Sequence, residues 1–299
     1  MRSFSFLVNP LSGGGAAPAA VVPVARLLRE AGAEVEVTYS PGPKASLDLV
    51  RAGVGRGDVI VAVGGDGMLS SIAGQVSELG GVLGMVPAGR GNDFARMLKL
   101  SDDPEVIAKT LLNGTETPTD LISVTLPGAE PSLVAGSVYS GVDARAGEIV
   151  DKVRWMPAKL QYPYASIHAL ATYVPSRFEV VVDGERHSFL AATVVVANSG
   201  YYGKGMHIAP DASVTDGVLD VIVIEASSRR EMVKALPKVY DGAHVLLDQV
   251  KVLKGARVEI SGIPSVPMGG DGEPLRMLPT SASAPAVVQV LPGVLKILV

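Results

Sequence analysis

The sequence predicts a two-domain protein in which an α/β domain with a parallel sheet precedes an all-β sandwich or barrel. Its 299 residues correspond to about two domains of ordinary size. As far as residue 120, short apolar segments alternate with helical ones, whereas beyond it strand-like segments follow one another with turn pairs between them. We therefore expect domains at 1–120 and 121–299 without a flexible linker.

The first domain is expected to alternate strands and helices from its start. Segment 58–63 (DVIVAV) is almost continuously apolar, which is typical of a parallel strand covered by helices on both faces. Segment 18–31 has apolar residues at helical spacing and stops at Gly32. The expected strands are 3–8, 35–39, 58–63 and 82–86, and the expected helices are 18–31, 44–52, 68–77 and 92–98.

The second domain is expected to be mainly antiparallel. Its strand-like segments are joined by residue pairs that favour tight turns, such as Asp183-Gly184 and Pro292-Gly293. Only two convincing helices interrupt them, at 159–173 and 229–240. The expected strands are 178–182, 191–197, 218–224, 257–260 and 287–291.

Composition excludes several classes of protein. The chain has no cysteine, which rules out disulfides, thiol nucleophiles and cysteine-bound zinc or iron–sulfur clusters. Its net charge is −4 and only 5% of its residues are aromatic, so we expect no nucleic-acid partner. The N-terminal segment does not resemble a signal peptide, and no segment approaches the ~18 apolar residues of a membrane span. We expect a cytoplasmic enzyme or ligand-binding protein.

A glycine-rich turn is the strongest local motif. Segment 63–68 (VGGDGM) joins a buried strand to a helix, where backbone N–H groups and the helix N-terminus favour phosphate. The alternative is a tight turn that needs glycine for conformational reasons alone. The motif lacks the Gly-Lys-Ser/Thr of a Walker A loop. As a dinucleotide fingerprint it is weak, because Ser70 takes the place of the third glycine and no acidic residue follows at the ribose position.

Two further polar loops follow other strands of the same sheet. These are 9–13 (NPLSG) and 87–93 (PAGRGND). The carboxyl ends of parallel strands meet at one edge of a sheet, which is where ligands of open α/β sheets bind. Each loop alone could be a simple connection, but three glycine-bearing loops at one edge favour a phosphate cradle.

Together these motifs resemble the diacylglycerol kinase catalytic-domain family of bacterial lipid kinases. The resemblance covers nearly the whole chain in the right order. In the first half it rests on the three loops and on the Phe94-Ala95-Arg96 that follows them. In the second half it rests on 140–144 (SGVDA), 197–198 (AN), 203–206 (GKGM), 209–212 (APDA), 216–220 (DGVLD) and 271–273 (DGE).

The resemblance implies ATP-dependent phosphorylation of a lipid hydroxyl. It also implies a Rossmann-like nucleotide domain of the kind found in NAD kinases and phosphofructokinases, followed by the all-β domain. Where the family usually has threonine, this chain has Met68 and Arg90. Arg90 could clamp a phosphate or point into solvent. The implied nucleotide contacts are Asn9, Pro10, Leu11, Ser12, Gly13, Ser40, Gly64, Gly65, Asp66, Gly67, Met68, Leu69, Ser70, Arg90, Asn92 and Asp93.

The resemblance also assigns catalytic and metal-binding residues. It makes Glu273 the general base that accepts the hydroxyl proton, although 271–273 also suits a plain hairpin turn. Asp66 is expected to partner catalytic Mg²⁺ and the phosphates, and Asp271 is expected to be catalytic with Glu273. The family's acidic cluster is matched by Asp93, Asp120, Asp216 and Asp271, and its second, structural Mg²⁺ site by Ser213, Asp216 and Val218. An ion-free turn is the alternative at 216–217.

Other functions remain open at this point. The first alternative is a kinase of NAD or another soluble metabolite. The second is a nucleotide- or lipid-binding module without turnover, and the departures from the family pattern at Met68 and Arg90 are the reason to consider it. Diacylglycerol is the first candidate among lipids, while phosphatidylglycerol, polyprenols and sphingoid bases stay open as acceptors. Homodimer formation is also left open. Segment 152–164 interleaves basic and aromatic residues, which suits either a helix edge or peripheral contact with an anionic membrane surface.

Overall fold

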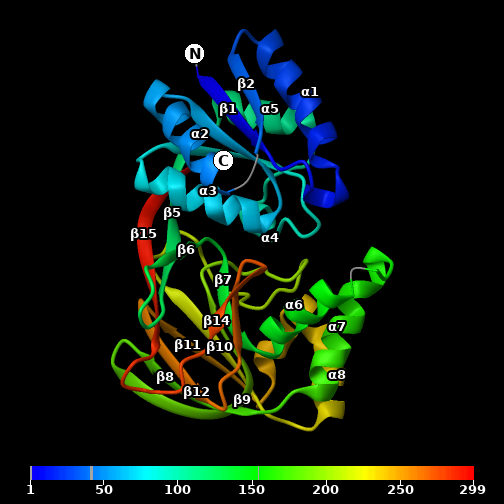
Figure 1. Cartoon of the computed structure of the whole chain (residues 1–299), viewed down its shortest axis with the longest axis vertical. Coiled ribbons are helices and arrows are strands. Elements are labelled where there is room, and N and C mark those ends of the chain that lie inside the picture. The colour runs from blue at the N-terminus through cyan, green and yellow to red at the C-terminus, as the bar shows by residue number, and fades with distance from the viewer. Residues whose placement is uncertain (1, 41–42, 154) are drawn as a thin grey trace.

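The computed structural model in Figure 1 has two lobes stacked along its long axis. It describes residues 2–40, 43–153 and 155–299, so Arg154 of the basic–aromatic segment lies outside the described residues. The N-terminal lobe is α/β and the C-terminal lobe is mostly antiparallel β, which confirms the predicted fold class. None of the described helices is both long and apolar enough to cross a bilayer.

The N-terminal lobe is built on a four-stranded parallel sheet in the order β2-β1-β3-β4. Helices α1 and α5 pack on one face and α2 and α3 on the other, each over its own apolar cluster. The strands are β1 (Ser3–Val8), β2 (Glu34–Tyr39), β3 (Val59–Gly64) and β4 (Val82–Pro87), and the helices are α1 (Ala17–Glu30), α2 (Pro43–Arg56), α3 (Asp66–Glu78), α4 (Asp93–Met97) and α5 (Pro104–Asn113), with a 3-10 turn η1 (Ser12–Gly14).

Helix α5 was missing from the sequence-based expectation. The signals for it are local, because Asp103 accepts hydrogen bonds from the N–H groups of Glu105 and Val106 and Pro104 occupies the first helical position. Its buried residues Ile107 and Leu111 then cover the sheet.

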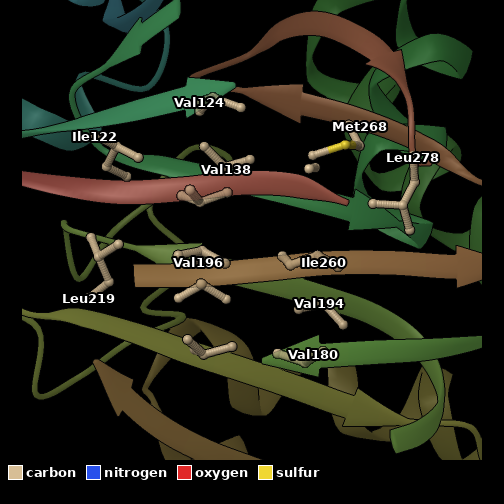
Figure 2. Packing of buried hydrophobic residues seen from close by; sticks show 14 of the residues in the cluster. Ile122, Val124, Val138, Val180, Val194, Val196, Leu219, Ile260, Met268 and Leu278 are labelled. Atoms are coloured by element: carbon tan, nitrogen blue, oxygen red, sulfur yellow. The ribbon is translucent and has the colours of Figure 1, made fainter. Parts of the chain in front are cut away.

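The C-terminal lobe encloses a core of aliphatic side chains (Figure 2). Val194 and Val196 of β9, Val180 of β8 and Ile260 of β12 meet there. Its strands are β5 (Glu116–Thr125), β6 (Ser132–Val134), β7 (Ser137–Gly141), β8 (Ser176–Val182), β9 (Glu185–Ala197), β10 (Leu219–Glu225), β11 (Val250–Gly255), β12 (Arg257–Ile263), β13 (Pro267–Gly270), β14 (Glu273–Met277) and β15 (Ala286–Leu298).

Helices cover one side of this lobe. They are α6 (Val142–Lys152), α7 (Ala158–Thr172) and α8 (Arg229–Tyr240), with a second 3-10 turn η2 (Ala243–Leu246). The expectation of two helices was therefore wrong by one. Helix α6 was missed because it follows β7 without a loop, through Gly141 at φ 105°.

Strands, and not a linker, connect the lobes. Residue 120 lies inside β5, which pairs along its length with β15. Strand β15 begins in the C-terminal lobe beside β12 and ends in the N-terminal sheet, where Lys296 and Ile297 pair in parallel with Val82 and Leu83 of β4. The two lobes thus share one continuous hydrogen-bonded sheet.

Candidate active site

A cavity of about 600 Å³ lies where the carboxyl ends of β1, β3 and β4 face the C-terminal lobe. The three polar loops predicted at this edge come together there. The N–H of Asn9 donates to the carbonyl of Val63, and a Cβ on Gly89 would collide with the Cα of Gly65. Glycine at 65 and 89 therefore allows two loops to touch, and the three loops lie together at this edge as expected.

The N-terminus of α3 points into this cavity. Its N-cap residue, Gly65, is extended and no side chain caps the helix. The amides of the first turn are left for an incoming group, and the helix dipole favours an anion at this place. A Cβ on Gly67 would lie 2.7 Å from Glu273 Oε1, so this helix start faces a carboxylate of the opposite lobe at close range.

Glu273 reaches this position on a hairpin tip. Strands β13 and β14 pair from Gly270 to Glu273, and the two residues between them have φ 45° at Asp271 and 87° at Gly272. These left-handed conformations are those of a type I′ turn. Segment 271–273 is therefore a hairpin turn that places Glu273 at the cavity. The interpretation as a turn and the interpretation as a catalytic motif are compatible.

Asp271 is an anchor within this hairpin. Its carboxylate accepts hydrogen bonds from the Ser70 hydroxyl (2.7 Å) and from the N–H groups of Ala135 (2.9 Å), Gly136 (2.9 Å) and Ser137 (2.8 Å). Burial raises the pKa of Asp271, and these donors act in the opposite direction. Since Ser70 belongs to α3, the carboxylate ties the β13–β14 hairpin to the N-terminal lobe.

A second acidic residue also bridges the lobes. Asp93 accepts hydrogen bonds from the N–H groups of Lys204 (2.8 Å) and Gly205 (2.7 Å). Burial, followed by the nearby charge of Asp66, raises the pKa of Asp93 to about 6. Asp66 accepts the N–H of Phe94 through Oδ1 at 3.1 Å, and its Oδ2 lies against Gly91 together with Oδ2 of Asp93, so this pair suits a divalent cation.

Two cations line the same mouth. Lys204 stands in a left-handed conformation (φ 70°) with its Nζ 3.6 Å from the ring centroid of Tyr162. Burial and the charge of Arg90 lower the pKa of Lys204, which places the two cations near each other. The Arg90 side chain also lies beside Gly14. Lys204 was not assigned a role from sequence, although its motif was noted.

The structure separates the acidic cluster expected from the resemblance. Asp93 and Asp271 line the cavity, but Asp120 is buried elsewhere and holds the N–H groups of Gly217 and Gly293, at 2.8 Å each. Asp216 accepts the N–H of Val218 at 3.0 Å. In the part of the chain that the structure describes, no three or more acidic or histidine side chains are grouped to hold a metal ion.

Most predicted nucleotide contacts line the cavity, and six do not. Ser70 and Leu69 are buried on the inner side of α3, and Asn92 shapes its loop by accepting the N–H of Gly89 at 2.8 Å. Among the described residues, those that line the cavity are Asn9, Leu11, Ser12, Gly13, Gly65, Asp66, Gly67, Met68, Arg90 and Asp93, with Asp271 and Glu273; those that do not are Pro10, Ser40, Gly64, Leu69, Ser70 and Asn92.

The cavity continues from its polar mouth into an apolar arm. This arm lies between α6, α7 and α8 and the sheet face of β9 and β10. Sequence reasoning missed it because its walls come from segments that are far apart in the sequence, on α6, α7, α8, β9, β10 and β11. The aliphatic side chains that line it include Val150, Leu170, Ile224, Leu236, Val239 and Val250.

Comparison with known proteins covers both lobes. The family description "Diacylglycerol kinase catalytic domain" matches residues 3–124, and "YegS C-terminal NAD kinase beta sandwich-like domain" matches residues 136–299. A diacylglycerol kinase of Mycobacterium tuberculosis (strain CDC 1551 / Oshkosh) is 30% identical over 289 residues, which cover 95% of this chain and 93% of that protein.

Other relatives and a solved structure give the same picture. A diacylglycerol kinase of Bacillus subtilis (strain 168) is 25% identical over 93% of this chain and 92% of that protein. A probable YegS-like lipid kinase of Cronobacter sakazakii is 24% identical over 84% of this chain and 83% of that protein. The crystal structure of a putative diacylglycerol kinase from Bacillus anthracis str. Sterne superposes with a TM-score of 0.78 at 19% identity, covering 99% of this chain and 96% of that one.

Proposed function

The chain belongs to the diacylglycerol kinase catalytic-domain family of lipid kinases, and on that premise we propose that it transfers the γ-phosphate of ATP to the hydroxyl of a membrane lipid. Diacylglycerol is the first candidate, with phosphatidic acid as its product. One observation carries the proposal: a helix N-terminus suited to phosphate faces the carboxylate of Glu273, and the cavity between them opens into an apolar arm.

The residues divide the work of phosphoryl transfer. The first-turn amides of α3, with the cations of Lys204 and Arg90, would hold the ATP phosphates. Glu273 would accept the proton of the lipid hydroxyl as the hydroxyl oxygen attacks the γ-phosphorus of ATP, and ADP would leave as the bond between that phosphorus and the β–γ bridging oxygen breaks. Asp271 acts through Glu273 by fixing the hairpin, which makes it a positioning residue.

Magnesium fits the carboxylates at the mouth. Asp66 and Asp93 both lie against Gly91, since a Cβ there would stand 3.1 Å from Oδ2 of each. These two residues would hold the ion, which neutralises phosphate charge when bound. For the second site, Asp216 and the backbone carbonyls of Ser213 and Val218 remain our proposal. One Asp216 oxygen already accepts the N–H of Val218, so the other would serve as the ligand.

Exposed apolar side chains on α7 support peripheral membrane association. Leu160, Tyr164 and Ile167 follow one another at helical spacing and are 53%, 43% and 50% exposed, and Trp155 before the helix is 81% exposed. Large apolar residues on one face of a helix favour insertion at a membrane interface. Other residues of α7, such as Leu170, line the apolar arm, so this face would bring the arm close to its lipid.

The test follows labelled phosphate from Mg-ATP into lipid extracts and into soluble acceptors such as NAD. Labelled lipid is the expected result; label in NAD alone would replace the proposal with a soluble-metabolite kinase. ATP bound without transfer to either would favour the non-catalytic module.

The variant Glu273→Gln should bind ATP normally and lose transfer by a factor of at least 100. Glu116→Gln, at an exposed position at the start of β5, is the matched control and should leave transfer unchanged. If Glu273→Gln turned over like this control, Glu273 would not be the base.

A further inference from the structure

An aromatic ring that has no part in the phosphoryl transfer proposed above lines the mouth of the cavity. Tyr162 belongs to α7 and is half-buried. Ala165 and Ala169, three and seven residues later, are fully buried, and residues at this spacing lie on one face of a helix. Tyr162 is therefore on the inward face of α7, and the packing of the two alanines fixes where its ring lies.

This ring contacts the ammonium group of Lys204. The Nζ atom of Lys204 lies over the ring of Tyr162, 3.6 Å from its centroid. The face of an aromatic ring carries negative potential and attracts a cation within about 6 Å. Tyr162 thus supplies an attraction to Lys204 from a segment of the chain that makes no other part of the phosphate-binding mouth.

The backbone of Lys204 is held separately from its side chain. Its N–H donates to Asp93 at 2.8 Å, and its φ of 70° lies between two glycines that are also left-handed, Gly203 and Gly205. These contacts fix the Cα atom but leave the flexible four-carbon stem free. Burial, followed by the charge of Arg90, lowers the pKa of Lys204. The ring contact acts in the opposite direction, because it favours the charged ammonium group and restricts its position.

The contact lies close to both groups that the proposed transfer needs. A Cβ on Gly91, which would touch the carboxylates proposed to hold magnesium, would also lie 3.5 Å from the Cα atom of Lys204. On the other side, burial raises the pKa of Tyr139, and the Asp271 carboxylate and the Tyr162 hydroxyl act in the same direction, which places them near Tyr139. Tyr162 therefore lies between the proposed magnesium site and the β13–β14 hairpin.

We propose that Tyr162 is a positioning residue, which holds the ammonium group of Lys204 through the face of its ring at the place where the phosphates of ATP bind. This role rests on the proposed lipid kinase function, which assigns Lys204 to those phosphates. The ammonium group has three N–H donors, so contact with the ring leaves donors for phosphate oxygens. A lysine that is already ordered loses less rotational freedom when ATP arrives, and the nucleotide binds more tightly.

The experiment measures the Kd for ATP by calorimetry in the absence of lipid. Tyr162→Leu should weaken ATP binding about three- to tenfold, the loss expected for a cation–π contact. Tyr162→Phe keeps the face of the ring and should bind ATP nearly as tightly as the wild type. The double variant of Tyr162→Leu with Lys204→Met should bind ATP no more weakly than Lys204→Met alone, because the ring acts only through the lysine.

The matched control is Tyr240→Leu, which removes an exposed tyrosine ring from the end of α8 and should leave the Kd for ATP unchanged. Thermal unfolding confirms that each variant is folded. If Tyr162→Leu does not fold, Tyr162→Gln takes its place in every comparison, since a glutamine side chain also lacks the ring face.

Three results would overturn the proposal. ATP binding by Tyr162→Leu as tight as that of the wild type would mean that the ring does not position the lysine. ATP binding by Tyr162→Phe as weak as that of Tyr162→Leu would mean that the hydroxyl, and not the ring face, is needed. Additive losses in the double variant would mean that Tyr162 affects ATP without the help of Lys204.

Lipid phosphorylation by the wild type separates this role from the proposed function. If Tyr162→Leu weakens ATP binding as expected but the wild type phosphorylates no lipid, the kinase function is refuted and the positioning role stands. If the wild type phosphorylates lipid and Tyr162→Leu binds ATP like the wild type, the positioning role alone is refuted. If the wild type binds no ATP, both are refuted.

Discussion

Replacing Gly67 by alanine should make the protein more stable and less active at once. Gly67 is the second residue of α3 and does not have a positive φ, so alanine fits its backbone. Alanine in place of helical glycine stabilises by about 0.5–1 kcal/mol. For a protein of this size, that corresponds to a rise in Tm of roughly 1–3 °C.

The effect on activity follows from the distance to Glu273. The new Cβ would lie 2.7 Å from Glu273 Oε1, and the end of this flexible side chain must then move away by several tenths of an ångström or more. A displacement of about 1 Å in a reacting group costs a factor of about 100. We therefore expect kcat to fall by a factor of about 30–100, while ATP still binds.

The assay combines lipid phosphorylation with differential scanning calorimetry on Gly67→Ala and on a matched control. Gly55→Ala lies in α2, where a new Cβ meets nothing within 4 Å, so it should share the gain in Tm and keep full activity. If Gly67→Ala kept its kcat, the close approach of Glu273 to α3 would have no catalytic meaning.

Three further changes have measurable consequences. Ser70→Ala removes the 2.7 Å hydrogen bond to Asp271 and should lower the free energy of unfolding by about 1–2 kcal/mol in urea titrations; an unchanged midpoint would contradict the anchoring role. Asp93 has a pKa of about 6 when folded against 3.8 unfolded, so its stabilising contribution is complete below pH 3.8 and is lost as the pH rises through 6. Without magnesium, the free energy of unfolding of the wild type should therefore fall by up to roughly 3 kcal/mol relative to that of Asp93→Asn between pH 4 and 7. If the two proteins showed the same dependence of unfolding free energy on pH, this reasoning would be refuted. Lys204→Met should raise the KM for ATP about tenfold, whereas Lys234→Met on α8 should not; equal values would remove Lys204 from the phosphate site.

Sequence patterns predicted which edge of the sheet carries the three polar loops, because the signals for these loops are local. The three loops each follow a buried strand, and a parallel sheet brings such loops to one edge whatever the details of packing. The directions of the Ser70 and Leu69 side chains could not be predicted in this way, because packing fixes the rotation of α3 about its axis. Ser70 consequently faces Asp271 and not the cavity.

The remaining parts of the site depend on contacts between distant segments. Asp143 contacts Thr193, which lies fifty residues later, and the 140–144 motif that contains Asp143 gives no indication of this partner. The apolar arm is walled by ordinary aliphatic residues of helices and strands that any core would use. Lys204 gains its position from a left-handed loop conformation that the flanking glycines permit but do not specify.

The passage of β15 into the N-terminal lobe affects how the chain folds. Strand β4 pairs with β3 on one side and with Lys296 and Ile297 on the other, so the N-terminal sheet gains its last neighbour from residues that are synthesised long after β4. Until then β4 presents an open edge, which invites pairing with other chains. A fragment ending at residue 124 would keep that edge permanently, and we expect it to aggregate instead of behaving as an independent nucleotide-binding unit.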